Sequence, residues 1–249
     1  MVHESIYGLI GYPLTHSFSQ QYFNRKFDAE SIAARYVNFE IPEIADFQDI
    51  IKDNPNLCGL NVTIPYKEQV IPYLDELDPD TAEIGAVNVI KFIRKGNKLR
   101  LKGYNSDVIG FTDSLSPLLT PKMKHALVLG TGGASKAVMQ ALKKLGISAT
   151  LVSRTPAEGR YTYSDLTPEI MAENLLIVNT TPLGMYPHMD ECPDIPYDQL
   201  TTDHLCYDLL YNPDVTLFMR KAAEHGAATK NGLEMLLLQA FAAWNIWQE

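Results

Sequence analysis

Two hydrophobic patterns alternate along the chain. Short apolar runs rich in β-branched and aromatic residues are typical of strands, and the stretches between them have apolar residues on one helical face. In the first part we expect strands at Ser5–Gly11, Arg35–Ile41 and Leu57–Val62, and helices at Ser17–Ala29 and Glu43–Asn54. Strands that alternate with helices predict an α/β protein with a parallel sheet.

Two further runs, Val87–Ile93 and Lys98–Gly103, flank Arg94-Lys-Gly-Asn97. Glycine and asparagine between two strand-like runs are typical of a β-hairpin. A helix-like stretch, Asp107–Leu119, follows. We therefore expect a domain boundary near residue 103.

The second part repeats the strand and helix pattern and ends in an amphipathic stretch, Gly232–Trp247. The expected strands are Ala126–Leu129, Ala149–Ser153, Leu175–Asn179 and Leu205–Leu209, with a helix at Ala134–Leu145. These are again βα units, closed by a C-terminal helix.

Composition and charge narrow the function classes. The chain has 249 residues, 46% of them hydrophobic and 20% charged, which fits one large or two modest globular domains with a packed core. The net charge of −9 and the absence of a Lys/Arg run argue against nucleic acid as a partner. No basic-apolar leader and no apolar run of about 20 residues is present, so we expect a cytoplasmic protein without a membrane segment.

The three cysteines, Cys58, Cys192 and Cys206, lack C-x-x-C spacing. An odd number without that spacing predicts neither a disulfide framework nor a zinc site. No metal is expected.

The string Gly130-Thr-Gly-Gly-Ala-Ser135 follows an apolar strand and opens a helix. Glycines there let a pyrophosphate approach the helix N-terminus, where backbone N–H groups and the helix dipole bind an anion. A glycine cluster also suits any tight βα turn. The strand that follows, ending at Ser153, completes the βαβ frame of a dinucleotide site and favours that interpretation.

The end of this second strand indicates which dinucleotide is bound. An acid roughly 20 residues after the turn would bind the ribose 2′-hydroxyl of NAD, but the chain has Ser153-Arg154-Thr155 there, followed by Arg160. A guanidinium beside hydroxyl groups suits the 2′-phosphate of NADP. The alternative is an ordinary surface arginine.

Two polar clusters of the first part are candidates for substrate chemistry. Asn61-Val-Thr-Ile-Pro-Tyr-Lys67 is expected to end a strand and start a helix, with Lys67 in its first turn, where a cation opposes the helix dipole. Asp107 starts the helix after the boundary. Taken singly, Lys67 reads as a solvated lysine and Asp107 as a helix cap.

Together with further short strings, these clusters resemble the shikimate dehydrogenase family, whose enzymes reduce 3-dehydroshikimate with NADPH in the shikimate pathway of aromatic amino acid biosynthesis. The resemblance runs from end to end. The strings in chain order are Pro13-Leu-Thr-His-Ser-Phe-Ser19, Asn61–Lys67, Gly85-Ala-Val-Asn88, Asn105-Ser-Asp107, Asn179-Thr-Thr-Pro-Leu-Gly184, Tyr207-Asp-Leu-Leu-Tyr211 and Gly232-Leu-Glu-Met-Leu-Leu-Leu-Gln239.

This resemblance implies a substrate-binding and catalytic α/β domain at residues 1–103 and a Rossmann-like NADP-binding domain at 104–231, with the helix of residues 232–249 packing back toward the first. It implies Lys67 and Asp107 as the catalytic pair. The implied substrate-binding residues are Ser17, Ser19, Asn61, Thr63, Asn88, Tyr211 and Gln239. The implied cofactor-binding residues are Gly130, Thr131, Gly132, Gly133, Ala134, Ser135, Ser153, Arg154, Thr155, Thr180, Leu209, Gly232 and Met235.

Three positions depart from the family pattern. Gln20 stands where proline usually follows the second serine, and Ser106 and Val108 replace the threonine and glycine that usually surround the aspartate. Val108 bears on which ring substituents are accepted rather than on the reaction.

Several alternatives stay open at this stage. A quinate/shikimate dehydrogenase that uses NAD would carry similar strings, although Arg154 and the missing acid speak against it. A folate-type dehydrogenase would not need Ser17, Ser19 and Gln239, and a non-catalytic sensor of a dinucleotide and a small acid would not need Lys67 and Asp107. We expect a monomer or homodimer whose partner is the small-molecule substrate.

Overall fold

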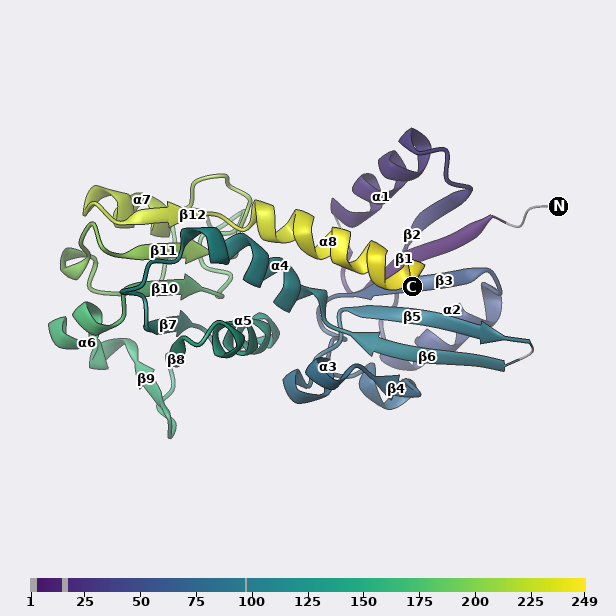
Figure 1. Cartoon of the computed structure of the whole chain (residues 1–249), viewed down its shortest axis with the longest axis horizontal. Coiled ribbons are helices and arrows are strands. Elements are labelled where there is room, and N and C mark those ends of the chain that lie inside the picture. The colour runs from purple at the N-terminus through teal and green to yellow at the C-terminus, as the bar shows by residue number, and fades with distance from the viewer. Residues whose placement is uncertain (1–3, 15–17, 97) are drawn as a thin grey trace. The chain divides into compact units, whose positions relative to one another are not determined.

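The computed structural model describes residues 4–14, 18–96 and 98–249. The chain forms two compact units, one of Met1–Ser106 with Ala240–Glu249 and one of Asp107–Gln239 (Figure 1). Helices α4 (Ser106–Leu115) and α8 (Leu233–Gln248) each contain a point where the chain passes from one unit to the other. The domain limits at residues 103 and 231 stay predictions.

The first unit contains a six-stranded sheet in the order β2-β1-β3-β5-β6-β4. The strands are β1 (Ser5–Gly11), β2 (Ala34–Glu40), β3 (Leu57–Val62), β4 (Glu76–Leu77), β5 (Val89–Lys95) and β6 (Lys98–Tyr104). β1 is parallel to β2 and β3, whereas β5 is antiparallel to β3 and to β6. The predicted hairpin is confirmed, with Asn97 outside the described residues, and it makes this sheet mixed rather than wholly parallel.

Alternation along β1 divides the core of this unit into two layers. Successive strand residues point to opposite faces of a sheet. Accordingly, Ile6 and Ile10 pack with the residues of helix α2 (Phe47–Asp53). Tyr7 and Leu9 pack with helix α1 (Phe18–Ala29) and with the C-terminal part of α8. The expectation that the C-terminal helix packs toward the substrate domain is thereby confirmed.

The end of α8 is fixed to the sheet by Trp247. Its indole Nε1 donates to the carbonyl of Ile90 at 3.1 Å. A Cβ at Gly59 would lie 2.3 Å from the same nitrogen, so only glycine on β3 leaves room for the indole.

The second unit contains a six-stranded sheet in the order β12-β11-β10-β7-β8-β9, parallel throughout (Figure 1). Its strands are β7 (His125–Leu129), β8 (Ser148–Ser153), β9 (Arg160–Thr162), β10 (Leu176–Asn179), β11 (Leu205–Asp208) and β12 (Ala228–Lys230). The strand order reverses between β7 and β10, which is where the Rossmann fold binds its ligand. The prediction of a Rossmann-like domain is confirmed.

The structure also contains short helices and strands that the sequence did not predict. Helix α5 (Gly133–Lys144) was expected, whereas several elements of three to eight residues were not. These are α3 (Pro79–Ile84), α6 (Pro168–Glu173), α7 (Leu217–Glu224), β9 and β12. The two-residue strand β4 was also not expected.

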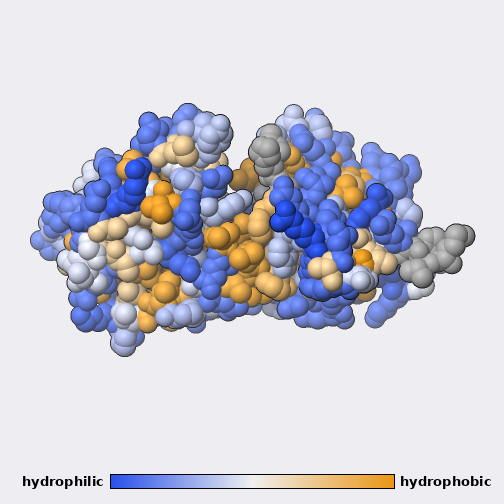
Figure 2. Space-filling model, turned by 90° about the horizontal axis from the view of Figure 1, so that it is seen from above, coloured by the Kyte–Doolittle hydropathy of each residue, from blue (hydrophilic) through white to orange (hydrophobic). Residues whose placement is uncertain are grey.

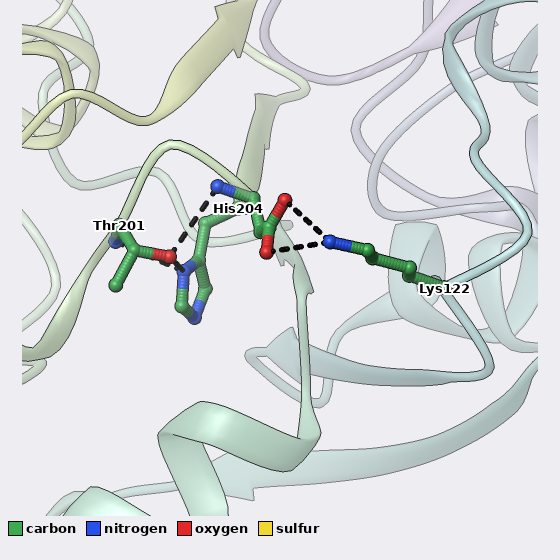
Figure 3. Close-up of polar contacts among 4 residues, drawn as sticks. Lys122, Thr201 and His204 are labelled. Atoms are coloured by element: carbon green, nitrogen blue, oxygen red, sulfur yellow. Dashed lines mark hydrogen bonds and ion pairs between the residues drawn. The ribbon is translucent and has the colours of Figure 1, made fainter.

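The turn before β11 is held from two sides (Figure 3). His204 is buried, its Nδ1 accepts from the backbone N–H of Thr201 at 3.0 Å, and its Nε2 lies 3.0 Å from the carbonyl of Met171. Because an amide N–H can only donate, the proton of this imidazole is on Nε2. Lys122 contacts both carboxylate oxygens of Asp203, so the turn that starts β11 is also tied to the segment before β7.

Hydrophilic residues dominate the face shown in Figure 2, and hydrophobic residues form smaller separate patches. Large apolar side chains that are more than two-fifths exposed include Ile64, Met185, Tyr186 and Val215. Within the described ranges, no helix is long and apolar enough to cross a membrane.

Candidate functional site

Three of the predicted substrate residues meet at one edge of the first sheet. Asn61 lies near the end of β3, Thr63 follows that strand, and Asn88 precedes β5. The side-chain amide of Asn61 donates to the carbonyl of Asn88 at 3.3 Å, and the same carbonyl accepts from the N–H of Val62 at 2.9 Å. Asn61 and Asn88 are both buried.

Lys67 belongs to the same edge, but the prediction that it sits in the first turn of a helix is wrong. Residues 64–70 form turns. The carbonyl of Lys67 accepts from the N–H of Val87 at 2.7 Å, and the N–H of Ile71 donates to the carbonyl of Glu68 at 3.3 Å, a spacing of three residues rather than the four of an α-helix. This bond places the half-buried Lys67 beside the segment that leads into Asn88.

The buried phenol of Tyr36 connects Asn61 with another predicted residue. Its hydroxyl donates to Oδ1 of Asn61 at 2.8 Å and makes a side-chain hydrogen bond with Ser19. Burial raises the pKa of Tyr36 well above its usual value, although the bond with Ser19 lowers it. The phenol is therefore neutral and serves as a fixed hydrogen-bonding group. Ser17, the other predicted carboxylate ligand, lies outside the described residues.

Asn88 also fixes the residue that precedes Asp107. Its Oδ1 accepts from the N–H of Ser106 at 2.7 Å, and its Nδ2 donates to the hydroxyl of Ser106 at 3.0 Å. Asn105 is held by a bond from its side chain to the carbonyl of Ala86 at 2.8 Å. Asp107 itself is half-buried in the first turn of α4, where an acid complements the helix dipole.

In the second unit, the glycine-rich turn joins β7 to α5. Gly130 has φ of 105°, a conformation that favours glycine. A Cβ there would also lie 2.9 Å from Oγ1 of Thr180. At Gly132 and Gly133 a Cβ would meet nothing within 4 Å, and the N-cap of α5 at Gly132 has no side-chain hydrogen bond. The helix N-terminus therefore faces open space, as pyrophosphate binding requires.

A cavity of about 630 Å³ lies beside this turn. Seven of the predicted cofactor residues line it: Gly130, Thr131, Gly132, Ser153, Arg154, Thr155 and Thr180. Seven further residues that were not predicted also line it: Val152, Tyr163, Thr181, Pro182, Leu183, Cys192 and Asp194. The cavity thus joins the turn after β7 to the loops after β8 and β10.

Charges of both signs act on Tyr163, which lines this cavity. Burial raises the pKa of its phenol, the Arg154 guanidinium lowers it, and the Asp194 carboxylate raises it. Arg154 and Asp194 are both exposed. A cation and an anion therefore lie at the part of the cavity where the strand β8 ends.

Some predicted hydroxyl groups shape the loops. Ser135 is buried and donates to the carbonyl of Gly132 at 2.6 Å. Ser153 is buried, and its hydroxyl bonds the backbone of Thr155 at 2.8 and 3.0 Å. Thr180 donates to the carbonyl of Leu129 at 2.7 Å. These contacts hold the cavity walls in place.

The structure brings a second group of predicted residues together near the start of α8. A Cβ at Gly232 would lie 2.0 Å from the carbonyl oxygen of Leu209, and the N–H of Gly232 donates to Leu210 at 2.9 Å. A Cβ at Gly110 on α4 would lie 2.6 Å from the carbonyl oxygen of Met235 and 2.9 Å from Cβ of Gln239. Tyr211 is 41% exposed.

A buried carboxylate organises the loops after β10 and β11. Asp208 accepts from Thr216 at 2.6 Å, from Asn179 at 3.0 Å and from the N–H of Leu210 at 3.0 Å. Burial raises its pKa to about 6, although these three bonds lower it. Asn179 in turn accepts from the hydroxyl of Thr181 at 2.7 Å, so Asp208 supports one wall of the cavity through Asn179.

Comparison with known proteins gives consistent results. Residues 9–90 match the family model described as the shikimate dehydrogenase substrate binding domain. The chain is 38% identical to the shikimate dehydrogenase (NADP(+)) of Carboxydothermus hydrogenoformans, over 96% of this chain and 90% of that protein.

Solved structures agree with these relatives. The shikimate dehydrogenase of Aquifex aeolicus superimposes with a TM-score of 0.85 at 35% identity, covering 99% of this chain and 94% of that one. The shikimate 5-dehydrogenase of Thermus thermophilus, solved with NADP(H) and shikimate, superimposes with a TM-score of 0.84 at 29% identity, covering 98% and 93% of the two chains.

Proposed function

The chain belongs to the shikimate dehydrogenase family, and we propose that it catalyses the reversible NADPH-dependent reduction of 3-dehydroshikimate to shikimate. It is an oxidoreductase of aromatic amino acid biosynthesis. The observation that supports the proposal is that Asn61, Thr63 and Asn88 lie together where β3 ends and β5 begins, with the backbone of Lys67 bonded to the segment that leads into Asn88.

The second unit fits NADP. The open space before the N-terminus of α5 would take the pyrophosphate, and Arg154 with Thr155 would take the 2′-phosphate. The cavity of about 630 Å³ is large enough for much of a dinucleotide. When bound, the reduced nicotinamide supplies the hydride. We propose Leu209, Gly232 and Met235 for its contacts.

Lys67 is the proposed proton donor to the ketone oxygen. As charge develops on that oxygen, an ammonium beside it both stabilises the charge and gives up a proton from Nζ. Asp107 is the second proposed catalytic residue. The half-buried position of Lys67 limits its contact with water, which strengthens its electrostatic effect.

Recognition of the ring is assigned to neutral polar groups. Asn61, Thr63 and Asn88 would bind the hydroxyl groups, and Ser17 and Ser19 the carboxylate. Tyr211 and Gln239 are further proposed substrate ligands. We also propose that the protein acts in the cytoplasm as a monomer or homodimer, where its small-molecule substrate and cofactor are its partners.

A steady-state panel tests the function. NADP and NAD are each combined with shikimate and quinate, and the reduced cofactor formed is followed by absorbance. The expected result is the highest kcat/KM for the pair of NADP and shikimate. A higher kcat/KM for quinate with NAD would favour a quinate dehydrogenase, and no turnover with any pair would contradict the proposal.

A further inference from the structure

Tyr36 is a buried residue next to Asn61, one of the proposed substrate ligands. It is 2% exposed on β2, and none of the strings that carry the family resemblance contains it. Its hydroxyl nevertheless contacts two proposed ligands, Asn61 on β3 and Ser19 on α1.

The position of this hydroxyl is fixed by contacts on the rest of the residue. The N–H of Tyr36 donates to Asn24 at 2.8 Å, and its carbonyl accepts from the same side chain at 3.0 Å. Its ring stacks on Phe23, with centroids 4.9 Å apart and planes 10° apart. Because backbone and ring are both held, the phenol oxygen has little freedom to follow a ligand.

The Tyr36 hydroxyl has a single proton, which determines the direction of its two hydrogen bonds. The oxygen Oδ1 of Asn61 can only accept, so the single phenol proton points to it. The phenol oxygen must then accept from the hydroxyl of Ser19. With Oδ1 turned to Tyr36, the Asn61 amide turns to the carbonyl of Asn88, and this bond uses one of its two hydrogens.

We infer that Tyr36 is a positioning residue that fixes the side chain of Asn61 for substrate. The inference rests on the proposed function. The second amide hydrogen of Asn61 is the group presented to a ring hydroxyl.

Tyr36→Phe removes the hydroxyl and keeps the ring. Since a buried acceptor on Asn61 then loses its donor, we expect the KM for shikimate to rise about tenfold, while the KM for NADP stays unchanged. The matched control is Tyr7→Phe, because Tyr7 is buried in the same hydrophobic cluster as Tyr36 and its hydroxyl accepts from Gln248 at 3.3 Å. Tyr7→Phe is expected to leave both KM values unchanged.

A double-mutant cycle separates positioning from simple loss of stability. If Tyr36 acts through Asn61, the pair Tyr36→Phe with Asn61→Ala has nearly the same KM for shikimate as Asn61→Ala alone. Multiplicative effects of the two substitutions, or a rise of the KM for NADP as large as that for shikimate, would overturn the inference. A wild-type protein without shikimate-dependent reduction of NADP refutes the proposed function instead.

NMR of the wild-type protein decides the question if Tyr36→Phe does not fold. The side-chain amide signals of Asn61, identified by their loss in Asn61→Asp, are expected as one set that shifts when shikimate is added. Two exchanging sets, or no shift at saturating shikimate, would show that the amide is not held for substrate.

Discussion

Two charged residues that line the cavity beside the glycine-rich turn are proposed to decide between the two nicotinamide dinucleotides. Arg154 supplies a cation where β8 ends, and Asp194 supplies an anion to the same region. A 2′-phosphate is attracted by the first and repelled by the second, whereas the 2′-hydroxyl of NAD bears no charge. Cofactor preference is therefore expected to depend on both side chains.

Arg154→Ala is expected to raise the KM for NADP about tenfold or more, because charge-assisted hydrogen bonds to a phosphate contribute roughly 1.5–3 kcal/mol. The KM for NAD should change little. Arg160→Ala is the control, since Arg160 has the same charge nearby in the sequence but does not line the cavity. Equal effects of Arg154→Ala on both cofactors would contradict the assignment.

Asp194→Asn should act in the opposite direction. Removing an exposed anion lowers repulsion of the 2′-phosphate, and screening by salt limits the effect to about a twofold to fivefold fall in the KM for NADP. Titration at low and high ionic strength checks this, because the difference from wild type should shrink with added salt. Asp198→Asn, outside the cavity lining, is the matched control.

At the scale of elements, glycine is needed at the starts of α5 and α8 for two different steric reasons. Gly132 caps α5 with φ of −79° and open space around a Cβ, whereas a Cβ at Gly232 would collide with the carbonyl of Leu209. The first glycine leaves room for a ligand, and the second leaves room for the chain itself.

Gly132→Ala and Gly232→Ala therefore form a matched pair. Gly132→Ala should keep the free energy of unfolding within about 0.5 kcal/mol of wild type and weaken NADPH binding, because the methyl group enters the space for the pyrophosphate. Gly232→Ala should destabilise the protein by roughly 1–3 kcal/mol, since the backbone must shift. Urea denaturation and fluorescence titration with NADPH measure the two effects, and the reverse pattern would contradict this account.

The longer elements could be predicted from the sequence because their periodicity is strong. β1 and β3 begin and end where the apolar runs do, and the βαβ frame around Gly130 follows from pattern and glycine spacing together. The short elements carried weaker signals. α3 and α6 begin with proline after an Asp or Thr N-cap, so their N-terminal signals were present, but six residues contain too little periodicity to identify a helix.

Other features depend on contacts between distant segments. Lys67 lies in turns because its carbonyl pairs with Val87, a partner that local pattern cannot reveal. Tyr36 in a strand looks like an ordinary core aromatic, and only its contact with Asn61 distinguishes it. Asp194 and Cys192 line the cavity from a loop without a periodic pattern. The sequence strings thus identified candidate residues, but not the buried groups that hold them.

At the scale of the whole molecule, the buried Asp208 makes stability depend on pH. Its pKa in the folded protein is about 6, above the usual 3.8, so the folded state holds this proton more tightly than the unfolded chain. Its contribution is fully present below the unfolded pKa and is lost as the pH rises through the folded one. The expected loss is on the order of 2–3 kcal/mol between about pH 4 and pH 6.5.

Urea denaturation of wild type and Asp208→Asn over this pH range measures that loss. The variant has no proton to titrate here and also loses an acceptor for Thr216, so it should be less stable throughout. The difference in unfolding free energy between the two proteins should narrow as the pH rises. A difference that is constant or widens would show that the carboxyl is not protonated near pH 6.

The central claim is that Lys67, in the first compact unit, transfers the proton, whereas the second unit binds the cofactor. The most direct test is Lys67→Ala, measured for kcat with shikimate and for the Kd of NADPH. We expect kcat to fall by about a hundredfold to ten-thousandfold, with the Kd unchanged, because the lost ammonium belongs to the chemistry and not to the cofactor cavity. Near-normal turnover, or a Kd that rises as steeply as kcat falls, would contradict the account.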